Sequence, residues 1–436
     1  MAEQGRWDRY WFGEASLVRL AVFRIVMMLA AFYALWHFRI GVFQHAGGED
    51  PSFLARTWHP IYAFDLLGIG PPGAAAAKFV FWALLSSLVL GAVGLFTRVA
   101  CASAALLTFY WIGTHYSFGK PHHDCVVLMF GLAALPFAPV GARLSVDSLL
   151  HRLRLARSGG DPLAVPEQAA WAGLPIRIVQ VTAALGYFFS GASKLAIGGF
   201  DWANGYTLQG IMLEYNSPWT RYFVEHVELC GLMSAGLLFV QASFPLIFVW
   251  RPLRWFYLPM AVLFHLLAMQ TMATGPFITL WFTLAAFVEL EKVPAFLERN
   301  LLRAALPRRL FWWVVTVGCL AGTAYIYTLR MPAWFLVVLI PLVVTGLLAC
   351  IERAKLGVVF DRGDAAARRA VAWLAAFDWA GRLRFAPSDG AAIEGGLSVT
   401  TAAGVRSSGA QGRTEARARL PLYAIGAPWS LLRWSR

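Results

Sequence analysis

The chain has 436 residues, of which 59% are hydrophobic and 14% charged, and its mean hydropathy is positive. About a quarter of the residues of a soluble domain are charged, so this composition argues against a soluble protein and favours a membrane protein. The net charge is +13, but no basic stripe stands apart from the apolar segments, which argues against nucleic-acid binding.

Apolar segments recur along the chain from residue 15 to residue 351. A spanning helix needs roughly 20 mostly apolar residues. We therefore predict an all-α polytopic membrane protein with about ten transmembrane helices, at about 15–37, 78–96, 99–117, 124–141, 174–194, 230–250, 252–271, 273–290, 310–329 and 333–351. The first segment contains Arg19 and Arg24 and lacks a small-residue cleavage site, so we expect no cleavable signal peptide.

The distribution of Lys and Arg predicts the orientation. With the N-terminus inside, the inner connections and helix ends carry fifteen Lys and Arg residues and the outer ones seven. This asymmetry agrees with the positive-inside rule. We predict an integral inner or plasma membrane protein with both termini in the cytoplasm. Segments 38–77 and 195–229 are then external, whereas loop 142–173 and the tail after residue 351 are internal.

Ionisable residues within the spans or at their outer ends are candidates for function, because charge is costly in a bilayer. They are Lys194, His115, His122, His123, Asp124, His265 and Arg24. Each has a structural interpretation as well. A terminal lysine can snorkel to the headgroups, the histidine cluster could be a hydrogen-bonded loop, and His265 could be an interhelical contact. Arg24 could pair with a carboxylate or cap backbone carbonyls.

All of these groups except Arg24 are expected in the outer half of the membrane, and their convergence favours a catalytic interpretation. A lysine desolvated beside Tyr187 and its aromatic neighbours would hold its proton less firmly and could act as a general base. His123 could orient an intermediate or stabilise an oxyanion. The five cysteines form no CxxC pair, and the histidines do not form several boxes at helical spacing. We expect no metal site and no disulfide framework.

Three motifs carry a family resemblance. The run Gly186-Tyr-Phe-Phe-Ser-Gly-Ala-Ser-Lys194-Leu, followed by Asp201-Trp202-Ala-Asn-Gly205-Tyr206, resembles the horizontally transferred transmembrane (HTTM) domain. This domain is the membrane module of vitamin K-dependent gamma-carboxylase. His122-His123-Asp124 with Arg143-Leu-Ser145-Val-Asp147, and Phe264-His265, are similar to two further elements of the family. We assign residues 1–295 to this domain and 296–351 to an additional two-helix membrane segment.

The resemblance implies that Lys194 is the base that deprotonates a reduced, vitamin K-like quinone, and that His123 supports the intermediate. His122, His265, Asp201, Trp202, Tyr187 and Arg24 would bind substrate or support the site. Ser193 replaces a second lysine of the family, and no large extracytoplasmic β-rich region follows the helices. We therefore expect quinol-linked oxygenation or carboxylation of a lipid or small molecule, with membrane lipids and a lipid-soluble quinol as partners.

The tail, residues 352–436, has its own pattern. Segments 356–361, 365–377 and 382–385 predict strand, helix and strand. The tail resembles a thioredoxin-like family that opens with D-G-D-C-x-x-C, but Asp364 and Ala367 stand where its two cysteines belong. Without a thiolate there is no thiol–disulfide exchange. We expect a small, degenerate cytoplasmic α/β domain, disordered at about 388–415, that could dock a cytoplasmic or redox protein.

Two other functions remain open. The missing cysteines also fit a non-catalytic membrane adaptor whose tail recruits a partner. A transporter of lipids or small molecules is the third alternative, although we find neither an internal repeat nor paired broken helices.

Overall fold

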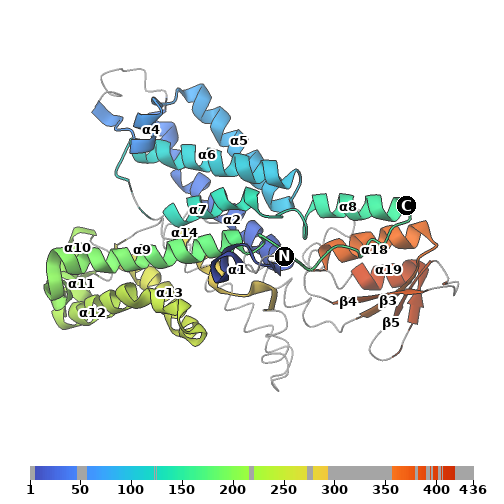
Figure 1. The fold of residues 1–436 in the computed structure, drawn as a ribbon. Helices are drawn as coiled ribbons and strands as arrows, with labels where there is room; N and C mark the ends of the chain where they lie inside the picture. The colour runs from blue at the N-terminus through green and yellow to red at the C-terminus, as the bar shows by residue number, and fades with distance from the viewer. Residues whose placement is uncertain are drawn as a thin grey trace.

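The computed structural model describes residues 5–46, 56–121, 123, 125–215, 220–272, 278–292, 356–378, 382–388, 393, 396–400, 404 and 406–417. This part of the chain is mostly helical, with a small sheet region (Figure 1). The predicted spans 310–329 and 333–351 lie outside the described residues, as do His122 and Asp124.

Helices occupy the other predicted spans. They are α2 (Leu17–His45), α5 (Ala74–Val93), α6 (Thr97–Ser117), α7 (Val126–Ala134), α9 (Leu174–Gly198), α12 (Val227–Ser243), α13 (Arg254–Met272) and α14 (Ile278–Leu284). Their buried apolar side chains form one continuous core, to which α2 contributes the most residues.

Three of these helices are long and apolar enough to cross a membrane: Leu17–His45, Ala74–Val93 and Val227–Phe248, which joins α12 to a 3-10 turn. The described residues therefore do not support a count of ten. α7 ends after nine residues, where Pro136 lies in a 3-10 turn, and α14 has only seven. α6 and α9 are long, but hydroxyl, amide and charged side chains interrupt their apolar stretches.

Short elements close the ends of the bundle. α1 (Arg6–Phe12) precedes a two-residue strand, β1 (Ala15–Ser16), which pairs with β2 (Gln168–Ala169) and ties the N-terminal segment to loop 142–173. α4 (Tyr62–Leu66) lies between α2 and α5. α10 (Tyr206–Tyr215) and α11 (Thr220–Glu225) connect α9 to α12.

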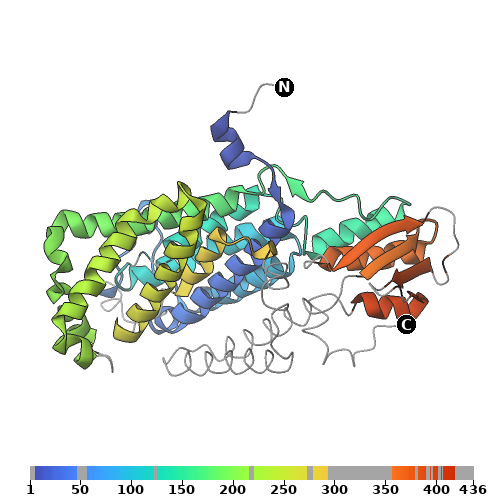
Figure 2. The same ribbon diagram turned by 90° about the horizontal axis from the view of Figure 1, so that it is seen from below.

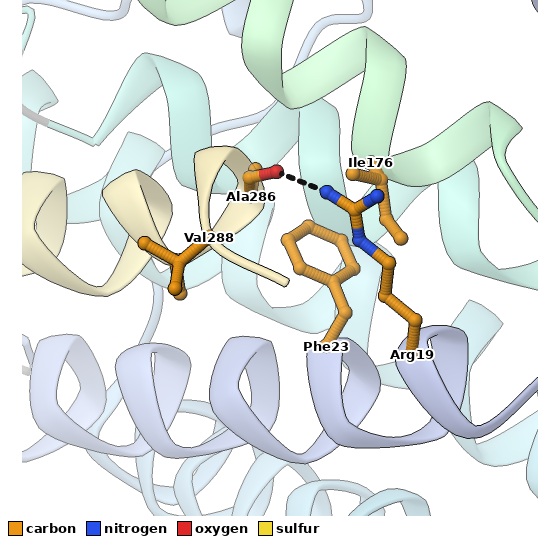
Figure 3. A pocket seen from close by; sticks show the side chains of 6 residues that line it. Arg19, Phe23, Ile176, Ala286 and Val288 are labelled. Atoms are coloured by element: carbon orange, nitrogen blue, oxygen red, sulfur yellow. Dashed lines mark hydrogen bonds between the residues drawn. The ribbon is translucent and has the colours of Figure 1, made fainter. Parts of the chain in front are cut away.

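A polar contact deep in the bundle fixes α2 against α9 and the chain after α14. Arg19 donates a hydrogen bond to the Ala286 carbonyl at 3.0 Å, and Gln180 donates to the same oxygen at 2.8 Å. Figure 3 shows Arg19 reaching over Phe23 and Ile176 toward Ala286. The side chains fill this recess and leave no room for a ligand.

The tail forms a separate α/β unit. Its elements are β3 (Leu356–Asp361), α18 (Ala365–Phe377), β4 (Leu383–Ser388), β5 (Leu397–Thr400), β6 (Arg406–Ser408) and α19 (Gly409–Arg417). The strand order is β4-β3-β5-β6, with β3 and β4 parallel and the other pairs antiparallel. The predicted strand–helix–strand is confirmed. The prediction of disorder is wrong for β5, β6 and most of α19, and β5 and α19 add Leu397, Val399 and Ala416 to the core of the unit.

The tail packs against α8 (Val146–Arg157), the helix of loop 142–173. Arg368 of α18 donates a hydrogen bond to the Ala156 carbonyl at 3.0 Å, and Leu163 packs against the tail's apolar core. Arg152 of α8 is buried, and burial lowers its pKa to about 10. Figures 1 and 2 show α8 and the tail at one end of the molecule, and α10 and α11 at the other.

Candidate functional site

Lys194 lies near the end of α9, half-buried, and neutral oxygens surround its ammonium group. Its Nζ donates hydrogen bonds to the Ser190 carbonyl (3.0 Å), the Ser190 hydroxyl (2.9 Å) and Oε1 of Gln241 (3.1 Å). The Trp202 ring lies 5.4 Å from Nζ. The ion pairs found among the described residues, Arg221–Glu225 and Lys292–Glu289, do not include Lys194. Its amine is therefore positioned by dipoles rather than by a carboxylate.

Helical spacing and a close helix contact bring these groups together. Ser190 and Lys194 are four residues apart, so they share one face of α9. Gly191 faces α12, where a Cβ atom would lie 2.8 Å from the backbone nitrogen of Ala242. Because glycine has no side chain, α12 can approach α9 closely enough for Gln241 to reach Lys194.

Trp202 is held by the turn that follows α9. This turn, η2 (Gly199–Asn204), ends at Gly205, whose φ of 94° lies in the left-handed region. A Cβ atom on Gly205 would lie 2.5 Å from both the Val227 carbonyl and the Gly231 nitrogen, so only glycine lets the turn rest on α12. Asp201 is in the same turn, but it is exposed and forms none of the hydrogen bonds described for Lys194.

A second polar contact lies deeper along α9. The Tyr187 hydroxyl and Nε2 of His265, both buried, are 2.7 Å apart, and Tyr187 stacks on Phe244 with a centroid distance of 4.3 Å. Exposed His123 lies close enough to His265 to interact with it electrostatically. Tyr187 is seven residues before Lys194, about 10 Å along the helix. The structure thus joins two of the predicted residues directly and aligns them with Lys194.

Arg24 lies elsewhere and has a structural contact. It is fully buried and donates hydrogen bonds to the carbonyls of Val140 (2.5 Å), Leu144 (2.6 Å) and Ala92 (3.3 Å). Of the two structural alternatives predicted for it, the structure supports the capping of backbone carbonyls.

The motif around Ser145 and Asp147 is a helix corner. Ser145 caps α8 by accepting a hydrogen bond from the Ser148 nitrogen at 2.9 Å. Asp147 accepts from the nitrogens of Phe96 (3.0 Å) and Thr97 (2.8 Å) and from the Thr97 hydroxyl (2.6 Å). The Asp147 carboxylate therefore caps α6 and does not lie beside Lys194.

Sequence reasoning missed Gln241 and Ser190. Gln241 is 4% exposed in an otherwise apolar helix, and an amide there is costly unless it is hydrogen-bonded. The amide of Gln241 within an apolar helix was therefore the feature of the sequence that could have identified it. Among the described residues, no group of three or more His, Cys, Asp or Glu side chains could hold a metal ion. No family model, curated protein or solved structure matches this chain.

Proposed function

We propose that this chain is a membrane-embedded enzyme of the HTTM type, similar to vitamin K-dependent gamma-carboxylase. In this proposal Lys194 is a base on the extracytoplasmic side, and a reduced quinone is oxidised in an oxygenation or carboxylation reaction. The observation that carries the proposal is the lysine amine held by Ser190 and Gln241, with no ion pair to a carboxylate of the described residues.

The residues around Lys194 fit a quinol. To act as a base, Nζ must first lose one of its three protons, and three neutral acceptors stabilise the ammonium form less than a carboxylate would. The indole of Trp202, 5.4 Å from Nζ, offers an apolar face for the aromatic ring of a quinol. When bound, a reduced quinone would supply the electrons for the reaction with oxygen. Ser190 and Gln241 would fix Nζ against its hydroxyl group.

The proposal also uses the predicted topology. Loop 142–173 and the tail were both assigned to the cytoplasm by the alternation of spans and the distribution of Lys and Arg. Their contact through α8 and α18 requires that both lie on the same side. Lys194 is 20 residues beyond the start of α9, about 30 Å along the helix. The proposal takes α9 as a spanning helix, and this length corresponds to the thickness of the hydrocarbon core.

The test compares two single variants, Lys194→Ala and Lys120→Ala. The second is the control and removes an exposed lysine that follows α6. Both proteins are purified in mild detergent, their quinones are quantified by mass spectrometry, and epoxide formation from added vitamin K hydroquinone is measured under oxygen. We expect Lys194→Ala to lose at least about 100-fold in rate, with Lys120→Ala unchanged. A folded Lys194→Ala protein with wild-type turnover would refute the assignment.

The adaptor alternative is favoured by one observation. Asp364 caps α18 by accepting a hydrogen bond from the Ala366 nitrogen at 2.7 Å. In the thioredoxin-like family that the tail resembles, a cysteine nucleophile occupies this position. The tail thus uses this position for structure. Its helix α18 already packs on α8 of the same chain, so the structure shows an internal partner for that face. A pull-down with the full chain that recovers a specific protein, lost when the tail is deleted, would favour the adaptor.

A further inference from the structure

A cleft of about 570 Å³ opens at the corner between α6 and α8, away from Lys194. Its walls are the first turn of α6, the turn at 139–142, the start of α8 and residues 165–166. Arg143 holds the last wall in place by donating to the carbonyls of Val165 (2.9 Å) and Pro166 (3.1 Å). The volume lies within the range of small-molecule sites.

Two basic side chains line this cleft, the exposed Arg98 of α6 and the exposed His151 of α8. The cleft's carboxylate, Asp147, is engaged by the α6 backbone and by Thr97. The negative charge of Asp147 therefore offsets the partial positive charge of the α6 N-terminus and does not pair with Arg98. Arg143 is hydrogen-bonded to the wall at Val165 and Pro166 and adds a third basic side chain next to the cleft, so the surroundings favour an anion.

One side of the cleft is apolar and continues a candidate membrane-spanning helix. α5 ends at Val93, and Phe96 and Val99 follow on the rim with 70% and 68% of their surface exposed. Large exposed apolar side chains beside an arginine, at the end of a spanning helix, are the arrangement expected where acyl chains meet headgroups. A soluble anion would leave these two side chains in water.

The backbone of Phe96 gives an independent indication. Its φ of 47° and ψ of 45° place it in the left-handed region, where glycine and asparagine are preferred. A bulky residue in this conformation is strained. The chain nevertheless places an aromatic ring there, exposed and on the rim of the cleft.

We propose that this cleft binds an anionic phospholipid, with the phosphate group between Arg98 and His151 and an acyl chain against Phe96 and Val99. This inference shares with the proposed function only the placement of the chain in a membrane. It does not depend on the chemistry of Lys194.

The test uses the full chain in detergent. Retention of phosphatidylglycerol and phosphatidylcholine is measured by native mass spectrometry for the wild type, for Arg98→Gln with His151→Gln, and for Arg154→Gln. Arg154 lies on the same helix but is exposed and does not line the cleft. We expect selective retention of phosphatidylglycerol, reduced about tenfold in the double variant and unchanged in the control. Equal retention in the double variant would overturn the proposal.

Phe96→Gly separates binding from folding. Glycine relieves the backbone conformation, so the unfolding temperature should be equal to or above that of the wild type, whereas retention of phosphatidylglycerol should fall. Unchanged retention would contradict the role of the ring. Inorganic phosphate and glycerol phosphate form the second arm. Thermal protection by either that equals the protection by phosphatidylglycerol would show a site for free phosphate and overturn the lipid assignment.

Discussion

Buried polar side chains in this protein fall into two groups that the sequence alone does not separate. Arg24 and Lys194 are both basic residues in apolar helices. Arg24 donates to three backbone carbonyls at a helix corner, and Lys194 donates to one carbonyl and two side-chain oxygens. Hydropathy could predict that each residue is costly in lipid. Only the approach of α12 at Gly191 shows that Gln241 meets Lys194.

Glu291, in the 3-10 turn η7 (Leu290–Lys292) that follows α14, provides a pH test at the scale of one residue. Its Oε2 atom is buried and has no hydrogen-bond partner in the described part of the chain, and burial raises its pKa. A raised pKa favours folding while the group is protonated, and this contribution is lost as the pH rises through the folded-state value. The ionised carboxylate therefore destabilises the protein at neutral pH.

We expect Glu291→Gln to be more stable than the wild type at pH 8, by on the order of 0.5 kcal/mol after solvent screening. The difference should vanish below about pH 4, where the carboxyl is protonated in both states. Thermal unfolding in detergent between pH 4 and pH 8 measures it. A variant that is less stable at pH 8 would mean that the carboxylate has a partner there.

At the scale of elements, the long apolar stretches of the sequence predict the positions of the helices. Local geometry determines where each helix ends. The first span was expected at 15–37, but α2 continues to His45 because Ile40 to Val42 are still apolar and helical. α7 stops at Ala134, before Pro136. In the tail, the alternating burial of Leu356 to Asp361 is the period of a strand with one covered face. The order of the strands depends on long-range pairing, which no local pattern encodes.

The cap on α6 gives a prediction for one element. Asp147→Ala removes three hydrogen bonds from the first turn of α6, so we expect a loss of about 1–2 kcal/mol in unfolding free energy. Asp147→Asn, which keeps one acceptor oxygen, should lose less. Denaturant unfolding in detergent measures both, with quinol turnover per folded molecule as the control. Unchanged stability together with lost turnover would assign this aspartate to the reaction instead of the corner.

At the scale of the molecule, the two ends carry different elements and different candidate sites. One end holds α8, the tail and the cleft beside Arg98, and the other holds α10, α11 and the turn of Trp202 beside Lys194 (Figures 1 and 2). Composition and charge could predict this polarity, because basic residues collect in loop 142–173. They could not predict that the tail rests on that loop, since the contact joins residues more than 200 positions apart.

Cysteine labelling tests this arrangement. In a variant whose five native cysteines are replaced by alanine, single cysteines are placed at Ser158 after α8, at Thr414 in α19 and at Arg221 in α11, all exposed positions. A membrane-impermeant maleimide on intact cells should modify only the cysteine at 221, because that segment is predicted to be external. Permeabilised cells should show labelling at all three positions. Labelling of 158 and 414 in intact cells, with 221 protected, would reverse the orientation and place Lys194 inside. Opposite behaviour of 158 and 414 would contradict the contact between α8 and the tail, because two segments that pack together cannot lie on different sides of a membrane.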